Sequence, residues 1–140
     1  MLFSAKAEYA CVAMLELAAR YDNPKPARLA DVADKHGIPP RFLVQILLDL
    51  KRAGLVASTR GAAGGYMLAR SPDDITLYDI LHVIDPPDLP VRQDDKLEPT
   101  VYVHNVRAIW DRMVEAQQAI LRQTSLAELL QQSQGLQYVI

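Results

Sequence analysis

The chain has 140 residues, of which 50% are hydrophobic and 23% are charged, and its formal net charge is −2. This length is enough for one compact domain but short for two independent cores. No apolar run approaches the roughly 20 residues that a membrane-spanning helix needs, and the first residues lead into polar Ser4, Lys6 and Glu8 rather than a signal peptide, so we expect a cytoplasmic protein with no membrane partner.

A first helix is expected from Ser4, a favourable N-cap, to about Arg20. Lys6 does not suit the positive end of a helix dipole, so a phosphate lying across this terminus would explain it, with an ordinary surface lysine as the alternative. Cys11 is the single cysteine, and its apolar neighbours favour buried packing over a redox role. The wide apolar face of the helix consists of Ala7, Ala10, Cys11, Met14, Leu15, Leu17 and Ala18.

Two short helices joined by a tight turn are expected next. Residues 29–36 form the first, Gly37 ends it in a left-handed conformation, and Pro39-Pro40 begin a second helix that runs to Arg52. The apolar residues of this second helix recur at helical spacing and are expected to face inward: Phe42, Leu43, Ile46, Leu47 and Leu50.

The outer side of the second helix then carries Arg41, Val44, Gln45 and Asp49. Arginine contacts guanine and glutamine contacts adenine through paired hydrogen bonds, each worth roughly 1 to 3 kcal/mol of discrimination. Arg41 and Gln45 are therefore candidates for reading base edges in a major groove. A solvated polar face is the alternative interpretation.

A glycine-rich hairpin follows Gly54, which can end the second helix. Residues 55–59 and 66–70 are predicted strands on either side of the loop 60–65. The glycines allow a sharp turn, and Arg60 places a planar cation beside it, where a narrow minor groove would attract it. A phosphate cradle would need the lysine and hydroxyl spacing of a nucleotide-binding loop, which this loop lacks.

Helix, tight turn, helix and glycine-rich hairpin, in that order, are typical of a winged helix-turn-helix, so double-stranded DNA is the expected partner. Residues 1–70 hold ten Lys and Arg against six Asp and Glu, an excess of +4, whereas residues 71–140 hold five against eleven, an excess of −6. The cationic half is the half with the helix-turn-helix. This distribution supports DNA binding without proving it.

Beyond the hairpin, residues 71–74 are expected to turn, and Thr76 is expected to cap a short helix from 77 to 83 or 84. Residues 85–99 follow, with four prolines and five acidic residues against two basic ones. This composition predicts a loop or linker rather than a part of the core.

A long helix is predicted from Thr100 to about Gln123. One stripe of this helix consists of Val103, Val106, Ile109, Trp110, Met113, Val114, Gln117, Ile120 and Leu121, all of them apolar except Gln117. The simplest burial for this stripe is against the same helix of a second chain, in a twofold dimer; packing on the first helix of the same chain is the alternative. The expected interface residues are Val106, Ile109, Trp110, Met113 and Ile120.

The expected fold is therefore mainly α with a small β-hairpin wing. A winged helix-turn-helix DNA-binding domain occupies residues 1–84, and the acidic proline-rich loop occupies 85–99. The dimerisation helix and a short terminal helix occupy 100–132, and 133–140 form a tail. Two such domains in a dimer would place their recognition helices in successive major grooves, roughly 34 to 36 Å apart, matching an inverted repeat.

The sequence also resembles a known family, the Rrf-two family of bacterial winged-helix transcription regulators, over about residues 1 to 132. The order and spacing of the segments are more specific than any one of them. The segments are Ser4-x-Lys6-x-x-Tyr9-Ala10, Leu29-Ala30-Asp31-Val32-Ala33, Gly37-Ile38, Phe42-Leu43-x-Gln45-Ile46-Leu47, Leu50-Lys51-Arg52-Ala53-Gly54-Leu55-Val56, Arg60-Gly61-x-x-Gly64-Gly65-Tyr66-x-Leu68-Ala69, Ile75-Thr76-x-x-Asp79-Ile80, Trp110 and Ser125-Leu126-Ala127-Glu128-Leu129.

The resemblance implies a homodimeric repressor or activator, of which we predict a repressor, with residues 41–52 in the major groove and Arg60 in the minor groove. Relatives commonly carry glutamate where this chain has Val44, and valine offers a base only apolar contact, so the operator preference is expected to differ. The DNA-binding residues that the resemblance and the motifs indicate are Lys6, Tyr9, Arg41, Phe42, Gln45, Lys51, Arg60, Gly61, Gly64, Gly65 and Tyr66.

Cluster-binding relatives carry three cysteines in the region that corresponds to residues 85–107, and this chain has none there. The corresponding positions hold Arg92, Glu98 and His104. One imidazole and one carboxylate do not replace three thiolates, so we predict no cofactor and no cysteine-ligated iron-sulfur cluster.

A hard or borderline metal is a weaker alternative: His104, Glu98, Glu8 and His36 could join Asp residues across a dimer to hold it, although their spacing supports no such site. The signal could instead be a small-molecule effector held between the winged domain and the long helix, a partner protein, or nothing.

No sequence motif indicates catalysis. The chain has no nucleophile elbow, dinucleotide fingerprint or zinc motif, and His36, His82 and His104 are scattered, so we predict that it is not an enzyme. A winged-helix module that holds a protein is the other alternative, because folds do not dictate function. DNA affinity that weakens steeply with salt would distinguish a DNA-binding protein from such a module.

Overall fold

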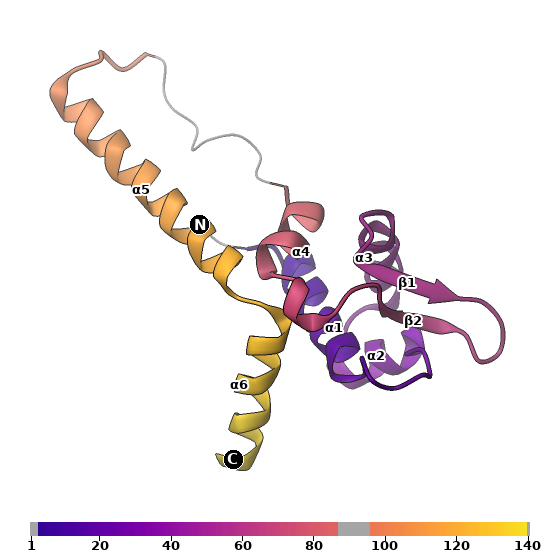
Figure 1. Ribbon diagram of the computed structural model, residues 1–140. Helices are drawn as coiled ribbons and strands as arrows, with labels where there is room; N and C mark the ends of the chain where they lie inside the picture. The colour runs from indigo at the N-terminus through magenta and orange to yellow at the C-terminus, as the bar shows by residue number, and fades with distance from the viewer. Residues whose placement is uncertain (1–2, 87–95, 140) are drawn as a thin grey trace.

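The computed structural model describes residues 3–86 and 96–139, with side chains as far as residue 134. Helices α1 to α4, a two-stranded hairpin and the start of α6 pack together, while α5 projects from them as a long rod (Figure 1). The fold is mainly helical with one small hairpin, which confirms the expected class. Within the described ranges, none of the helices combines the length and apolar character required to span a bilayer.

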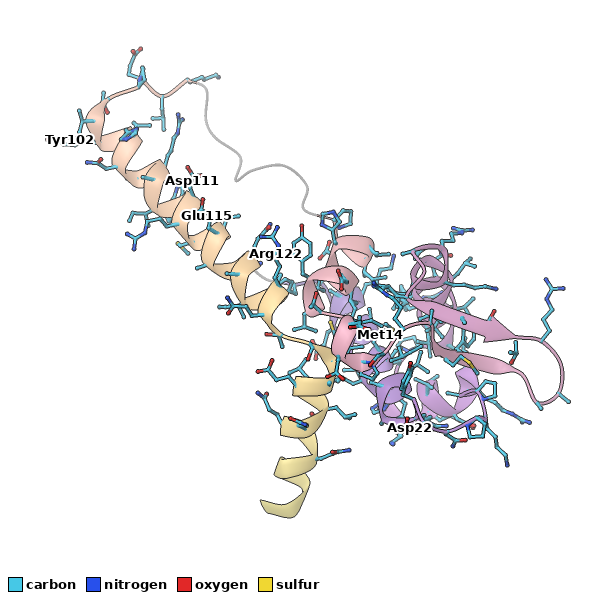
Figure 2. The ribbon with its side chains drawn as sticks, viewed as in Figure 1. Met14, Asp22, Tyr102, Asp111, Glu115 and Arg122 are labelled. Atoms are coloured by element: carbon cyan, nitrogen blue, oxygen red, sulfur yellow. The ribbon has the colours of Figure 1, made fainter. Side chains whose placement is uncertain are left out.

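Helix α1 (Ala5–Ala19) lies at the centre of the domain and contacts α2, α3, α4, α6 and β2. Its N-terminus is capped as expected, because the Ser4 hydroxyl accepts a hydrogen bond from the backbone N–H of Ala7 at 3.1 Å. Small residues let the neighbouring elements approach closely, and Met14 is fully buried among them. Figure 2 shows Met14 within the packed domain.

Helices α2 (Leu29–His36) and α3 (Pro40–Arg52) form the expected helix-turn-helix. Gly37 ends α2 at φ +67°, the left-handed conformation that favours glycine, and Pro40 occupies the first turn of α3. Four of the five apolar residues predicted to face inward from α3 are buried, but Phe42 is 43% exposed. The prediction for Phe42 was wrong because its ring lies at the edge of the apolar stripe, beside Tyr9 of α1.

A single buried charge fixes α2 against α1. The carboxylate of Glu16 accepts from Arg20 at 2.7 Å and lies 2.8 Å from both the Lys35 ammonium and the His36 ring nitrogen Nε2. Burial would raise the pKa of Glu16, but the hydrogen bonds from Lys35, Arg20 and His36 outweigh it and lower the pKa to about 2. Sequence periodicity gave no sign of this cluster.

Strands β1 (Val56–Thr59) and β2 (Gly65–Leu68) pair antiparallel, with Val56 opposite Leu68 and Thr59 opposite Gly65. Both are a little shorter than expected. The other edge of β2 is also covered, since Ala27 and Tyr66 exchange two backbone hydrogen bonds of 2.8 Å. The hairpin is therefore tied to the segment that leads into α2.

A short 3-10 turn, η1 (Pro72–Asp74), precedes α4 (Leu77–Ile84). Thr76 caps α4 as expected, and the cap is reciprocal: its hydroxyl accepts from the N–H of Asp79 at 3.2 Å, and the Asp79 carboxylate accepts from the N–H of Thr76 at 3.0 Å. Most of the predicted 85–99 loop, residues 87–95, lies outside the described residues.

Helix α5 (Val101–Gln123) begins at its Thr100 cap, and none of its residues is fully buried. Figure 2 shows Tyr102, Asp111 and Glu115 along the rod, away from the domain, whereas Arg122 reaches α4. There the Arg122 guanidinium lies 4.4 Å from the centre of the Tyr78 ring.

Helix α6 (Leu126–Val139) follows α5 after a bend and runs on at an angle to it (Figure 1). Backbone hydrogen bonds of 2.9 Å join Leu77 to Thr124 and Leu126 to Ile75, and Leu126 is fully buried. The contact with α1, considered above for the long helix, is thus made by α6. The terminal helix is also longer than expected, because its backbone continues past residue 132 to Val139.

Candidate nucleic-acid interface

The outer side of α3 is uncovered along its whole length. Its exposed side chains include two apolar ones, Val44 at 46% and Leu48 at 37%. The others on this side that the structure leaves exposed are polar or charged: Arg41, Gln45, Lys51 and Arg52. This arrangement confirms that Arg41 and Gln45 face away from the core, as their spacing predicted, so both are available to a ligand outside the domain.

At the N-terminal end of α3, an aromatic pair joins this helix to α1. The rings of Tyr9 and Phe42 are 6.3 Å apart between centroids and tilted by 42°. The Arg41 guanidinium lies over the outer side of this pair, 5.3 Å from the centre of the Phe42 ring. The exposed Phe42 ring therefore contacts both Tyr9 and Arg41.

At the other end of α3, Asp49 collects three polar neighbours. Its carboxylate accepts from the Gln45 amide nitrogen at 3.0 Å, and its other oxygen lies 3.6 Å from the Lys6 ammonium. Arg52 is more distant, at 3.8 Å. Two of the sequence-derived candidates, Lys6 and Gln45, are thus brought together by a residue that the sequence did not single out for a role.

The hairpin loop extends away from the domain (Figure 1). Arg60 is exposed at its start, and Gly61 has φ +102°, which a side chain would oppose. A Cβ on Gly64 would collide with the carbonyl oxygen of Thr59, and one on Gly65 with that of Ala27. These glycines give the loop its shape; its surface cation is Arg60.

Arg28 braces the loop and was missed by sequence reasoning. Its Nη2 donates to the Ala62 carbonyl oxygen at 2.7 Å. Arg28 stands just before α2, outside both the apolar pattern and the glycine-rich segment. The sequence shows only that Arg28 is a charged residue next to a predicted helix, which does not indicate a contact with Ala62.

The weaker metal candidates form no metal-binding group in the described part of the single chain, and their joining across a dimer stays a prediction. Glu8, Glu98 and His104 are all exposed, and the described residues contain no group of three or more side chains that could hold a metal ion. Arg92, which corresponds to one of the missing cysteines, lies outside the described residues. Cys11 is partly buried on α1, and burial together with the charge of Glu8 raises the pKa of its thiol to about 11. Its thiol is therefore protonated at neutral pH.

A helix-turn-helix with an exposed polar second helix, followed directly by an antiparallel hairpin, defines the winged helix-turn-helix class. The family model described as Rrf2, Iron-dependent Transcriptional regulator, matches residues 3–132. The chain belongs to the Rrf2 family, the one that its sequence resembles. It is therefore a helix-turn-helix transcription regulator and not an enzyme, as expected.

Named relatives agree with this assignment. The HTH-type transcriptional regulator CymR of Bacillus subtilis is 35% identical over 135 residues, 96% of this chain and 94% of that protein. An rrf2-like HTH-type regulator of Rhodobacter capsulatus is 44% identical over 92 residues, which are 64% of this chain and 61% of that protein.

Solved structures show the same fold. That of B. subtilis CymR, described as the global cysteine regulator, has a TM-score of 0.82 at 34% identity and covers 94% of this chain and 97% of its own. That of T. potens IscR has a TM-score of 0.76 at 30% identity and covers 95% of this chain and 88% of its own.

Proposed function

We propose that this protein acts as a homodimeric, sequence-specific repressor that reads an inverted repeat in double-stranded DNA. The observation that carries the proposal is the uncovered outer side of α3, with Arg41 and Gln45 exposed on it, beside a hairpin that extends from the same domain (Figure 1). Such a helix enters a major groove, and the hairpin reaches the adjacent minor groove. As a regulator of genes, the protein is proposed to act in the cytoplasm with the chromosome.

Arg41 and Gln45 are proposed to contact base edges, and Arg60 the minor groove. The remaining members of the proposed surface hold the backbone or shape the surface rather than read sequence. These are Lys6, Tyr9, Phe42, Lys51, Gly61, Gly64, Gly65 and Tyr66.

The dimer is proposed to form through α5. Val106, Trp110, Met113 and Ile120 follow the four-and-three spacing of a coiled-coil seam, and Ile109 lies beside them. These five side chains are between 43% and 64% exposed in the single chain, so an apolar strip, interrupted by Gln117, runs along the rod. A second copy of α5 would cover that strip and hold two reading helices at a fixed separation.

The signal that controls binding is proposed not to be a cysteine-ligated cluster. Cys11 is the only thiol of the chain, and its place in the domain packing leaves no set of thiolates for iron. A small molecule bound between the domain and α5 is the alternative that we retain.

Recovering genomic fragments bound by the purified protein, and then titrating a labelled fragment at several salt concentrations, tests this function. We expect a strong preference for the recovered sequence. We also expect an affinity that falls steeply with salt, because binding to phosphates releases their counterions and added salt opposes that release. Absence of preference for any fragment would contradict the proposal. Affinity that is insensitive to salt would favour a protein-binding module.

A further inference from the structure

We propose that Asp49 is a specificity-determining residue of the recognition helix, an inference that rests on the DNA-reading role proposed for α3. Its carboxylate orients the Gln45 amide toward the bases and restrains Lys6 from binding phosphate indiscriminately. The proposal rests on the position of the Asp49 carboxylate, which accepts from the Gln45 amide nitrogen at 3.0 Å and lies 3.6 Å from the Lys6 ammonium.

The contact with Gln45 decides which way its amide faces. An ionised carboxylate only accepts hydrogen bonds, so the amide nitrogen must face Asp49 and the amide oxygen must point elsewhere. Gln45 and Asp49 are four residues apart, one helical turn, so the bond runs along the exposed side of α3. The amide oxygen and the second N–H are left as an acceptor and donor pair, the combination that the N6 and N7 edge of adenine takes.

The contact with Lys6 acts on every duplex alike. Phosphates are present whatever the sequence, so a free lysine beside the recognition helix strengthens binding to all DNA. Asp49 offers Lys6 a competing anion, with Arg52 at 3.8 Å from the same carboxylate, and adds its own repulsion toward phosphates. Indiscriminate binding is lowered, while the oriented Gln45 amide favours the duplex with the matching base. Restraint of Lys6 lowers the affinity for every duplex, and the oriented Gln45 amide raises the ratio of specific to non-specific affinity.

Two substitutions separate these effects. Asp49→Asn removes the charge and keeps an oxygen that can accept from Gln45, whereas Asp49→Ala removes both. We expect Asp49→Asn to raise affinity for a random duplex by about two- to fivefold, as for a released surface ion pair. We expect Asp49→Ala to lower the preference at the base pair read by Gln45 by at least about fivefold. Asp74→Asn, an exposed carboxylate on η1, removes the same charge away from α3 and is the matched control.

The test uses the purified full-length chain and fluorescence anisotropy on three kinds of duplex: the recovered operator, the operator with each base pair changed in turn, and a random sequence of equal length. Gln45→Ala locates the base pair that Gln45 reads, and circular dichroism checks that each variant is folded. The inference is supported if Asp49→Ala loses preference at that base pair, and if Asp49→Asn, unlike Asp74→Asn, binds random DNA more tightly.

Wild-type preference in Asp49→Ala would overturn the orienting role, and so would a Gln45→Ala variant that changes preference at no base pair. Unchanged affinity of Asp49→Asn for random DNA would overturn the restraining role. If the wild-type chain itself does not distinguish the operator from random DNA, the proposed function fails, and the role of Asp49 falls with it. A wild-type chain without preference for the operator thus contradicts the proposed function. A wild-type chain with that preference, together with an Asp49 variant that behaves like it, contradicts only the role of Asp49.

Discussion

Arg28 and Ala62 join the helix-turn-helix to the wing: Nη2 of Arg28 donates to the carbonyl oxygen of Ala62 at 2.7 Å, although the residues are 34 positions apart. This bond acts on the loop that carries Arg60, in addition to the two backbone hydrogen bonds between Ala27 and Tyr66 that tie the hairpin to the segment before α2. Pre-ordered loops bind more tightly, since less freedom is lost on binding.

Arg28→Ala is therefore expected to weaken operator binding by about 0.5 to 1.5 kcal/mol, the net worth of such a hydrogen bond. Arg28→Lys keeps the charge but not the planar donor, and should restore only part of the affinity. Anisotropy titration measures both. Lys25→Ala removes a charge from the neighbouring loop and serves as the control; equal losses in Arg28→Ala and Lys25→Ala would mean that Arg28 acts by charge alone.

Arg60→Ala and Arg41→Ala are each expected to weaken operator binding by at least about 1 kcal/mol without changing the mass of the dimer. Both side chains are exposed, so neither change should disturb the core. Titration of the labelled operator, with light scattering on the same samples, measures the two effects. Wild-type affinity in both variants would mean that the DNA-contacting surface lies elsewhere on the domain.

Acid should destabilise the domain through Glu16, whose pKa is lowered to about 2 from the usual 4.5. A carboxyl with a lowered folded-state pKa contributes stability that is complete above the unfolded value and is lost as the pH falls toward the folded one. A lowered pKa of this size contributes on the order of 1 to 3 kcal/mol to the free energy of unfolding, because solvent screens the pairing with the exposed Lys35, and this contribution is lost between about pH 4.5 and pH 2.

Urea denaturation at a series of pH values tests this. Glu16→Gln should be less stable at pH 7 and should flatten the acid dependence, because the titrating group is gone. Glu8→Gln changes an exposed carboxyl on the same helix and is the control. An unaltered pH profile in Glu16→Gln would show that the cluster with Lys35, Arg20 and His36 does not stabilise the fold.

Trp110→Asp should convert the dimer to a monomer. The substitution places a carboxylate in the proposed seam between two α5 helices, where it would be buried without a partner. Tyr21→Asp is a matched control, since Tyr21 at 44% is about as exposed as Trp110 at 43% but lies at the end of α1. Light scattering reports the mass. A Trp110→Asp variant that keeps the dimer mass would exclude Trp110 from the interface.

Local features of the fold could be predicted from the sequence because they depend on residues that are close along the chain. Ser4 and Thr76 cap helices through bonds to residues three positions away, and Gly37 ends α2 by its own backbone conformation. The same is true of the exposed strip on α5, which follows from helical spacing alone. Helical spacing does not show which element covers an apolar strip. Packing of the long helix on α1 was one alternative, and the helix that packs on α1 is α6 rather than α5.

Several contacts that sequence reasoning missed join distant residues. Glu16 meets Lys35 and His36 across two helices, and Arg28 meets Ala62 across two elements. Their identities suggested only solvated charges, because pairing depends on how the elements pack. The prediction that Phe42 faces inward was wrong for a related reason. Helical spacing placed it in the apolar stripe, but its ring lies beside Tyr9 of a different helix.

Hydroxyl-radical footprinting of the recovered operator tests the central claim most directly, since it shows where and how often the protein touches DNA. We expect two protected half-sites of inverted sequence, with centres roughly 34 to 36 Å apart, about one turn of the duplex. A single protected site, or two in the same orientation, would contradict a twofold dimer that presents two α3 helices.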